Sequence, residues 1–357
     1  MPNYSGPMTR RIGPGLLLIA AFAIAAAESS AANGPKAAKA AAPAPPPVQR
    51  GLVYVVDNAH SFMEFSVRLL GFNRVRGAFP DYEAHIYYDS SSVTRSAVSM
   101  RIAVAGVSTH EPERDHHLES ADFFDAAKFP YMRFDSRQIV ADGSGFVAVG
   151  DPTIRDVTRP IAVPFAITSP LGVDPFGNPR FSVAGRVTLS RNDYGVLGPA
   201  FWNKSIGDSV EIEFEFGARR WNYDDLGWNN SPRKSIGEFI LNAADSVGMD
   251  RALQASRDRW ARRQAGPEWN FGLFEYMKCA GRLGQHGRPG EGAEVLKQVI
   301  ELRADSTAAP DLAALLCQRA ELLTLAGQGR AAHDELARAM AVDSASTYVR
   351  ALRHAID

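Results

Sequence analysis

The sequence predicts an all-β antiparallel domain followed by an all-α domain built from repeats. From about residue 51 to residue 218, apolar and polar residues alternate, which is the period of a strand with one buried face. After residue 235, apolar residues recur at helical spacing. Gly287 and Gly327, 40 residues apart, open two similar amphipathic segments, and such self-similarity is typical of helical repeats.

Length and charge narrow the functional classes. The chain has 357 residues, enough for about two domains. Its formal net charge is -1 at pH 7, which gives no reason to expect a polyanionic partner. A nucleic-acid partner is therefore not expected.

Residues 1–32 are typical of a secretory signal peptide. Arg10 and Arg11 precede the apolar run LLLIAAFAIAAA, and small residues follow it. The run is shorter than the roughly 20 residues that span a bilayer, so a cleaved signal is favoured over an uncleaved anchor. We therefore expect a periplasmic or secreted protein. Residues 33–50 are rich in Ala and Pro and read as an extended linker.

Residues 51–218 are expected to form the β domain. The alternation is clear in HSFMEFSVRLL, SAVSMRIAV, FSVAGRVTL and VEIEFEF, and turn signals such as ADGSG and DPFGNP separate the runs. Such short strands with tight turns favour an antiparallel sandwich or an up-and-down barrel. A barrel of about eight strands either fills its interior with side chains or encloses one small ligand.

Residues 219–234 read as a linker, and residues 235–357 as the helical domain. Gly248 is expected to separate two helices, and residues 271–342 contain two helical pairs that resemble tetratricopeptide repeats, with an inserted loop at 305–311. Such arrays bind peptides or proteins, so a protein partner is one expectation, and a stabilising or dimerising module is the alternative. Cys279 and Cys317 are either small buried apolar residues or, after export, a disulfide.

The segment RDHHLESADFFDAAKFP, residues 114–130, has three interpretations. A metal site would use His116 and His117 with Asp115 or Asp122, yet adjacent histidines diverge, unlike the i, i+4 pair of a zinc helix. A structural loop would pack its apolar side chains onto the barrel.

The third interpretation is an enzyme site, in which the segment would need partner residues elsewhere in the β domain. Ser61, beside His60 and Asp57, is the candidate partner for acid-base or nucleophilic chemistry. The β domain contains no G-x-S-x-G elbow, no cysteine and no phosphate loop. Catalytic chemistry is therefore not favoured, and no catalytic or metal-binding residue is assigned.

The same segment resembles the signature of the YceI-like family of polyisoprenoid-binding proteins, close to R-D-x-H-L-x-S-x-D-F-F-D followed by Pro. Further similarities occur in order: DNAHS at 57–61, GAF at 77–79, ST at 108–109, GDPTIRDVTRP at 150–160 and SRNDYG at 190–195. The similarity spans nearly the whole β domain. Pro152 and Asp156 depart from the family pattern, which puts local strand pairing in doubt because Pro lacks a donor and Asp156 must tolerate an unusual turn.

The resemblance implies a lipocalin-like barrel that holds an isoprenoid chain, such as a quinone or a polyprenyl lipid, in an apolar tunnel without catalysis. The lipid is a ligand, and no cofactor is implied. We expect one face of each strand, with two aromatic residues of the signature, to line the tunnel: Met63, Phe65, Val67, Val98, Met100, Ile102, Phe123, Phe124, Phe134, Val183, Val187, Ile212 and Phe214.

Polar residues at a mouth are expected to meet the head group, with His60, Arg114 and Asn192 as candidates. A transient membrane contact is a further expectation, for which a basic helix surface is one candidate: Arg257, Arg259, Arg262 and Arg263. The competing hypothesis is a scaffold whose active part is the helical array and whose barrel is filled.

Overall fold

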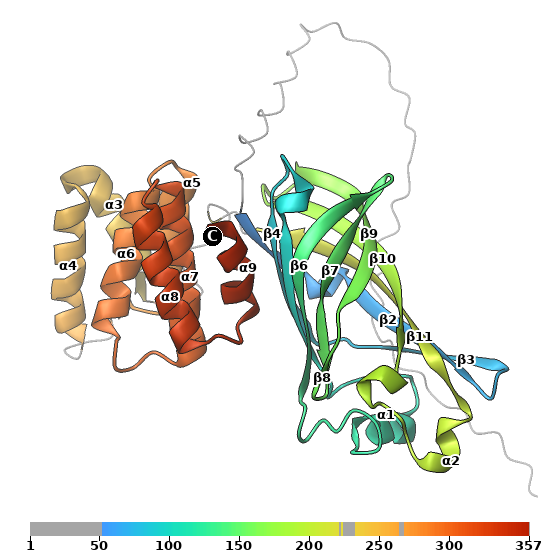
Figure 1. Cartoon of the computed structure of the whole chain (residues 1–357). Helices are drawn as coiled ribbons and strands as arrows, with labels where there is room; N and C mark the ends of the chain where they lie inside the picture. The colour runs from blue at the N-terminus through green and yellow to red at the C-terminus, as the bar shows by residue number, and fades with distance from the viewer. Residues whose placement is uncertain (1–51, 221–222, 224–232, 264–267, 357) are drawn as a thin grey trace, which may run out of the picture. The chain divides into compact units, whose positions relative to one another are not determined.

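The computed structural model describes residues 52–220, 223, 233–263 and 268–356. The expected signal peptide and first linker, and most of the second linker, lie outside these residues. The described residues belong to one compact unit, Pro45–Asp357. The β domain and the helical region predicted from the sequence are both present, in that order (Figure 1).

Antiparallel strands form the β domain and close into a barrel. The strands are β1 (Leu52–Val56), β2 (Phe62–Leu69), β3 (Asn73–Ala78), β4 (Tyr82–Tyr88), β5 (Ala97–Ala103), β6 (Tyr131–Asp142), β7 (Gly145–Ile154), β8 (Val157–Thr158), β9 (Ile161–Val173), β10 (Pro179–Ser190) and β11 (Ile206–Arg219). The order β1-β4-β5-β6-β7-β9-β10-β11 returns to β1, so eight strands of the described chain complete the ring. This confirms the barrel and excludes the sandwich.

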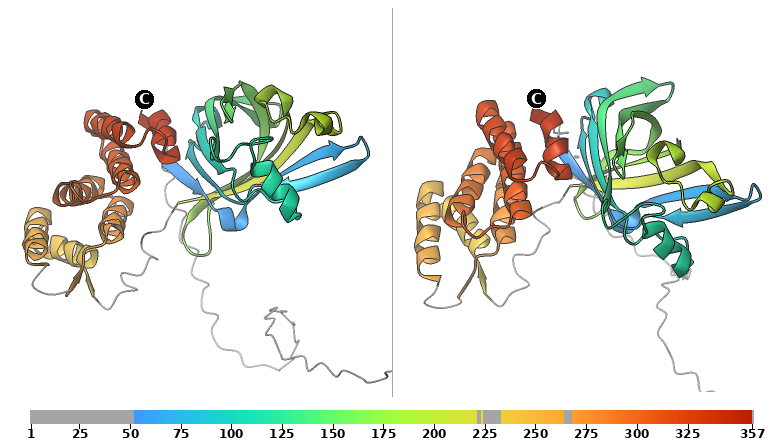
Figure 2. Two further views of the ribbon diagram at one scale, coloured as in Figure 1. Left: turned by 90° about the horizontal axis from the view of Figure 1, so that it is seen from below. Right: turned by 60° about the horizontal axis from the view of Figure 1, so that its bottom comes forward.

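The long strand β11 makes the sheet fork. Its last residues pair with β1, whereas most of its length pairs with β2. Strand β1 then pairs with β4, and β2 pairs with β3. The β2–β3 hairpin therefore extends one wall of the barrel, and Figure 2 shows it projecting past the neighbouring strands.

Two short helices, α1 (Pro112–Glu119) and α2 (Ala200–Asn203), lie at one end of the barrel (Figure 1). A helix starting at Pro112 agrees with the sequence, because Pro is favoured in a first helical turn. Its N-cap is Glu111, whose side chain accepts from Arg114 N–H. Ser120 ends the helix, where its backbone N–H donates to His117 O.

The two departures from the family pattern leave the sheet intact. Pro152 is paired with Phe134 of β6 and its carbonyl accepts from Arg159 N–H, so its missing donor is not needed by the ladder. The unusual turn residue expected at Asp156 is instead Arg155, whose φ is 57°. The left-handed conformation thus falls one residue earlier than predicted.

The helical region contains seven helices within the described residues: α3 (Ile236–Val247), α4 (Met249–Ala261), α5 (Leu273–Gln285), α6 (Pro289–Leu302), α7 (Ala309–Leu325), α8 (Gly329–Val342) and α9 (Thr347–Ile356), with the short parallel pair β12 (Lys234–Ser235) and β13 (Trp269–Asn270). The break at Gly248 is confirmed. Gly287 and Gly327 have φ of 76° and 73° and end α5 and α7 with equivalent hydrogen bonds, so the two turns repeat in structure.

Cys279 and Cys317 are both free and buried. Burial raises the pKa of Cys279 to about 12 and raises that of Cys317 still further. The two cysteines are therefore packed apolar residues of the helical core, as one of the two interpretations expected, and not a disulfide.

Helices α7 and α9 contact the barrel through a buried polar group. One carboxylate oxygen of Glu321 accepts from Val53 N–H at 3.1 Å and from Arg220 at 2.6 Å, and the other accepts from the Tyr348 hydroxyl at 3.2 Å. Beside it, His85 Nδ1 lies 2.9 Å from Thr347 Oγ1, and its ring stacks on that of Tyr348. The helical region is thus joined to the barrel by specific pairs.

Candidate functional site

The barrel encloses a cavity of about 720 Å³. This volume is in the range of small-molecule sites, roughly 300–1,000 Å³. Its wall is formed mainly by apolar side chains from the inward faces of the strands. A barrel filled with its own side chains, which the scaffold hypothesis required, would leave no such space.

All thirteen side chains expected to line a tunnel do line this cavity. The alternation in β2 explains why, since residues two apart face the same side of a strand. Met63, Phe65 and Val67 of β2 line the cavity. On the neighbouring strand β11, Glu211 and Glu213 lie on the outer face and are partly exposed. Whether these thirteen hold a ligand stays a prediction.

The cavity also includes apolar residues that were not predicted. Strand β9 contributes Ile161, Val163 and Phe165 at alternate positions, between the exposed Ala162 and Pro164. The same period of two would have identified them. Others come from the short helices α1 and α2 and from the segment after β10, where no strand period marks them: Leu118, Tyr194, Val196 and Trp202.

Buried aromatic rings close one end of the cavity. Tyr88 stacks on Phe181 at 4.1 Å between ring centroids, and Tyr54 contacts both rings edge-on. Phe216 packs between Tyr82 and Phe214. Burial raises the pKa of Tyr54 and of Tyr82 to about 12, so both stay neutral.

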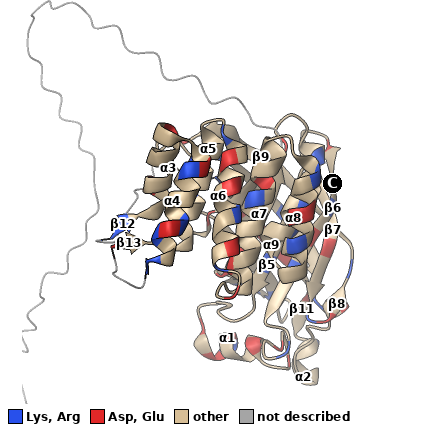
Figure 3. Ribbon diagram, turned by 90° about the vertical axis from the view of Figure 1, so that its left-hand side faces the viewer, with Lys and Arg blue, Asp and Glu red and all other residues tan. Residues whose placement is uncertain are grey.

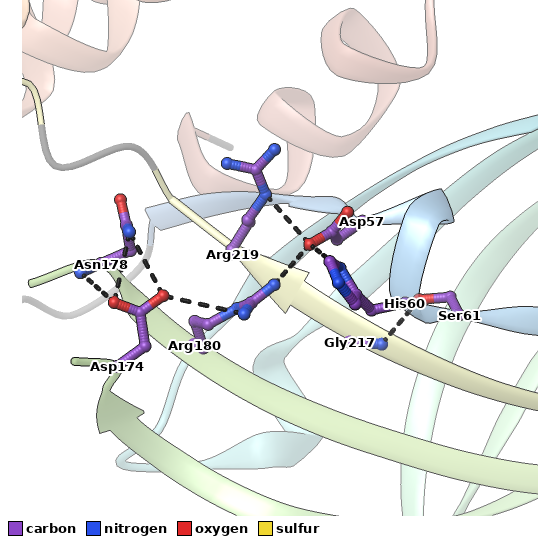
Figure 4. Close-up of polar contacts among 8 residues, drawn as sticks. All are labelled: Asp57, His60, Ser61, Asp174, Asn178, Arg180, Gly217 and Arg219. Atoms are coloured by element: carbon purple, nitrogen blue, oxygen red, sulfur yellow. Dashed lines mark hydrogen bonds and ion pairs between the residues drawn. The ribbon is translucent and has the colours of Figure 1, made fainter. Parts of the chain in front are cut away.

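Figure 4 shows an ion cluster centred on Asp57. Its carboxylate accepts from Arg180, lies 3.4 Å from Arg219 Nε and 3.1 Å from His60 Nδ1. Burial alone would raise the pKa of Asp57, but the hydrogen bond from His60 and the charges of Arg219 and Arg180 lower it below its ordinary value. The cluster ties β1, β10 and β11 together and reinforces the closed end.

The catalytic candidates His60, Ser61 and Asp57 lie outside the cavity and are held by hydrogen bonds within the barrel. Ser61 Oγ accepts from Gly217 N–H at 2.9 Å, and His60 is bonded to Asp57 (Figure 4). None of the three lines the cavity. His60 and Asn192, expected at a mouth, are also outside the lining, whereas Arg114 is part of it.

The signature segment covers the opposite end of the barrel. Phe123 is buried against Tyr194 and Val196, and Phe124 lies edge-on to Phe79 at 5.8 Å between ring centroids. Both rings line the cavity. Polar residues of the signature segment fix its conformation, since Arg114 donates to Thr109 Oγ1 at 2.7 Å.

The two histidines of this segment do not form a metal centre. His117 Nε2 lies 2.8 Å from Asp122 Oδ2, which fixes the turn after α1, while His116 is exposed. In the part of the chain that the structure describes, no group of three or more His, Cys, Asp or Glu side chains is placed to hold a metal ion.

Arg191 organises the loop that carries α2. The side chain is buried, and burial lowers its pKa below the ordinary value, although the charge of Asp208 acts in the opposite direction. Its donors instead bond the carbonyls of Val196, Leu197, Asn203, Ile206 and Gly207. Arg155 connects this loop to the signature segment through Phe123 O and Gly195 O.

Most of the charged and other small polar residues in the cavity lining lie on or beside α1. They are Thr109, Glu111, Glu113, Arg114 and His117, whereas Glu64, Ser96, Arg133 and Arg191 come from other parts of the wall. The cavity therefore has an aromatic closed end and a more polar end at the helices. The arrangement suits an elongated apolar ligand with one polar head.

The fold and the cavity together define a closed antiparallel β-barrel protein with an internal apolar cavity. The chain belongs to the YceI-like family, whose family model, described as YceI-like domain, matches residues 54–218. Within the described residues, no helix combines the length and apolar character needed to cross a membrane.

Curated relatives agree with this assignment. A UPF0312 protein of Pseudomonas savastanoi pv. phaseolicola is 32% identical over 165 residues, which cover 45% of this chain and 84% of the relative. A UPF0312 protein of Shewanella sp. strain ANA-3 is 34% identical over 164 residues, covering 44% of this chain and 85% of that protein. Both alignments leave more than half of this chain unmatched, so they support the family of the barrel alone.

Solved structures give two further similarities. Burkholderia cenocepacia BcnA is 22% identical with a TM-score of 0.41, covering 45% of this chain and 98% of that one. A structure described as a polyisoprenoid binding domain from Saccharophagus degradans is 15% identical with a TM-score of 0.38, covering 47% and 98% respectively.

Proposed function

We propose that this protein is an exported, non-enzymatic lipid carrier that holds the tail of an isoprenoid lipid, a quinone or a polyprenyl lipid, in the barrel for sequestration or transport. The observation that carries the proposal is the apolar cavity of about 720 Å³ in a YceI-like barrel. The sequence pattern of residues 1–32 supports export to the periplasm or beyond.

Elementary energetics favour such a ligand. Burial of apolar groups contributes about 0.8 kcal/mol per CH₂, so a five-carbon isoprene unit contributes about 4 kcal/mol if each carbon counts as one CH₂. Binding must offset roughly 4–15 kcal/mol for the translational and rotational freedom that the ligand and the protein lose on association. A few units are therefore sufficient for stable retention, without any polar contact along the tail.

The position of polar groups supports an orientation for the lipid. The tail would lie against the inward faces of the strands, with its end toward Phe181 and Tyr88. The head group would lie near α1, where Arg114 and the neighbouring carboxylates reach the lining. The helical region would bind a protein partner, a role suggested by its resemblance to tetratricopeptide repeats.

Mass spectrometry of an organic extract tests the proposal. We expect the signal-free protein, purified from a host that makes isoprenoid quinones, to carry a near-stoichiometric prenyl lipid that is absent from an empty-vector control. A clean extract, repeated after incubation with quinones and polyprenyl phosphates, would contradict the proposal and favour the helical region as the active part.

A pair of variants on β10 makes this test specific. Val187 lines the cavity, and its neighbour Thr188 is exposed on the outer face. We expect Val187→Trp, which fills part of the cavity, to reduce retained lipid about tenfold or more, and Thr188→Trp to retain it. Circular dichroism of both variants controls for folding.

A further inference from the structure

Large apolar side chains are exposed at the polar end of the barrel, on two loops that lie side by side. Phe72 in the β2–β3 turn is 85% exposed, and Phe201 in α2 is 74% exposed. Leu70 N–H donates to Ser205 O at 2.6 Å, which brings the two loops together. Leu70, Leu197 and Trp202 are exposed as well. We call Leu70, Phe72, Leu197, Phe201 and Trp202 the apolar rim.

The exposure of these apolar side chains does not contribute to the stability of the fold. Leu70 has a φ of 55°, a left-handed conformation that disfavours a side chain with a Cβ, and Gly or Asn would adopt it with less strain. A soluble barrel would be expected to place polar residues in such a turn. Exposed apolar patches of this kind mark interaction sites.

Cations lie beside the rim. Arg68 and Arg74 are directly opposite one another on β2 and β3, and like charges in that arrangement destabilise a hairpin. The charge of Arg74 is compensated by Glu211, whose Oε1 lies 3.2 Å from Arg74 Nη1. Among the residues that the structure describes, no carboxylate pairs with the exposed Arg68, Arg76 or Lys204. An anionic partner would compensate this charge.

The rim continues into the cavity. Trp202 belongs to both the rim and the cavity lining, and Leu69 and Ile206, next to Leu70 and Ser205, also line the cavity. A surface that binds the rim therefore lies next to the place where a lipid would enter.

From these observations we infer that the apolar rim, with Arg68, Arg76 and Lys204, docks the barrel on the surface of an anionic phospholipid bilayer. Aromatic rings prefer the membrane interface, and each cation near an anionic surface strengthens binding about fivefold. This inference rests on the proposed function, since it supplies the route by which a lipid leaves the bilayer for the cavity.

The basic surface of α4, considered from the sequence, is a weaker candidate. Arg259 lies over Phe239 and Trp269, Arg263 over Trp260, and Arg257 lies 3.6 Å from Glu301. Charges of both signs are interspersed on these helices (Figure 3). Its cations are engaged within the chain, whereas the three at the rim pair with no carboxylate among the described residues.

Vesicle flotation tests the inference, with vesicles of phosphatidylethanolamine and phosphatidylglycerol compared with phosphatidylcholine alone. We expect the full signal-free chain to bind only the anionic vesicles and to lose affinity at high salt. The double variant Phe72→Ser, Phe201→Ser should bind at least about tenfold more weakly. Substitution of Arg68, Arg76 and Lys204 by Ser should weaken vesicle binding about fivefold for each cation removed.

Phe176→Ser is the matched control. Phe176 is 73% exposed in the β9–β10 turn, next to the closed end of the barrel, so its variant should bind vesicles like the wild-type chain. Equal binding by all variants, or none by the wild type, would overturn the inference, as would a rim-dependent homodimer in place of vesicle binding. Mass spectrometry of lipid retained by the same samples separates the two proposals: vesicle binding without retained lipid would refute only the carrier function.

Discussion

At the scale of single residues, His85 is a titratable group that is buried where the barrel contacts the helices. Thr347 Oγ1 donates to Glu83, so it accepts from His85 Nδ1–H. Burial lowers the pKa of His85 to about 4, although the charges of Glu83 and Glu321 act in the opposite direction. The neutral ring thus belongs to the contact between β4 and α9.

This environment predicts a pH dependence of stability. The ordinary pKa of 6.5 applies to unfolded His85, and about 4 applies in the fold. Between these values the unfolded chain binds more protons, so the stabilising effect is complete above pH 6.5 and is lost as the pH falls toward 4. The loss should be on the order of 2–3 kcal/mol.

Denaturant unfolding at several pH values measures it. We expect His85→Gln to flatten the decline of the free energy of unfolding between pH 6.5 and 4, and His116→Gln, at an exposed position, to keep the wild-type slope. Parallel curves for His85→Gln and the wild-type chain would show that His85 is not responsible.

Single residues also show how far the sequence could be interpreted. Eleven of the thirteen lining residues were identifiable because alternation along a strand fixes which face each side chain takes, and Phe123 and Phe124 were identified from the family signature. The roles of Arg155 and Arg191 were not, because both bond backbone carbonyls of loops, and such contacts leave no trace in residue type or spacing. The position of His60 at a mouth of the barrel was predicted wrongly, because its residue type and its neighbours in the sequence do not indicate at which end of the barrel it lies.

At the scale of elements, Glu321 of α7 connects the helices to β1 and Arg220. Burial alone would lower the pKa of Arg220, and the carboxylate of Glu321 raises it well above its ordinary value. Removing one partner of such a buried pair leaves an uncompensated charge. The pair is thus a strong determinant of the attachment of α7.

We expect Glu321→Gln to lower the free energy of unfolding by about 3 kcal/mol or more. Glu294→Gln is the control, because Glu294 lies 3.9 Å from Lys297 with both side chains half exposed, and such surface pairs contribute little. Chemical denaturation of both variants provides the comparison. Losses of equal size would mean that Glu321 acts as an ordinary surface carboxylate.

The elements were predicted with uneven success for a physical reason. Local signals located the strands, the break at Gly248 and the repeated turns at Gly287 and Gly327. The fork of the sheet was not predictable, because it arises when β11 pairs with β1 and β2 in succession, and pairing between distant strands is not written in local periodicity. The contact of α9 with β4 is likewise a long-range feature.

At the scale of the whole molecule, a bound lipid should stabilise the fold. A ligand that binds only the folded state adds about 2.7–4.1 kcal/mol at 100 to 1,000 times its Kd. For a folded unit of more than 300 residues that corresponds to roughly 4–6 °C in Tm. Delipidated protein should therefore melt lower, and a matching prenyl lipid should restore the Tm.

Scanning calorimetry of the loaded, stripped and reloaded protein measures this effect, with Val187→Trp as the control that should respond little to stripping. An unchanged Tm across the three wild-type samples would argue that the cavity binds no lipid with useful affinity.

The buried aromatic rings and the Asp57 cluster lie at the end of the barrel opposite the signature segment. Under the proposed function, an isoprenoid lipid would therefore enter the barrel tail first and leave through the same end, with its head group facing outward. The protein would cover the apolar tail and expose the head group, so an acceptor that recognises the head group could bind it before the lipid is withdrawn.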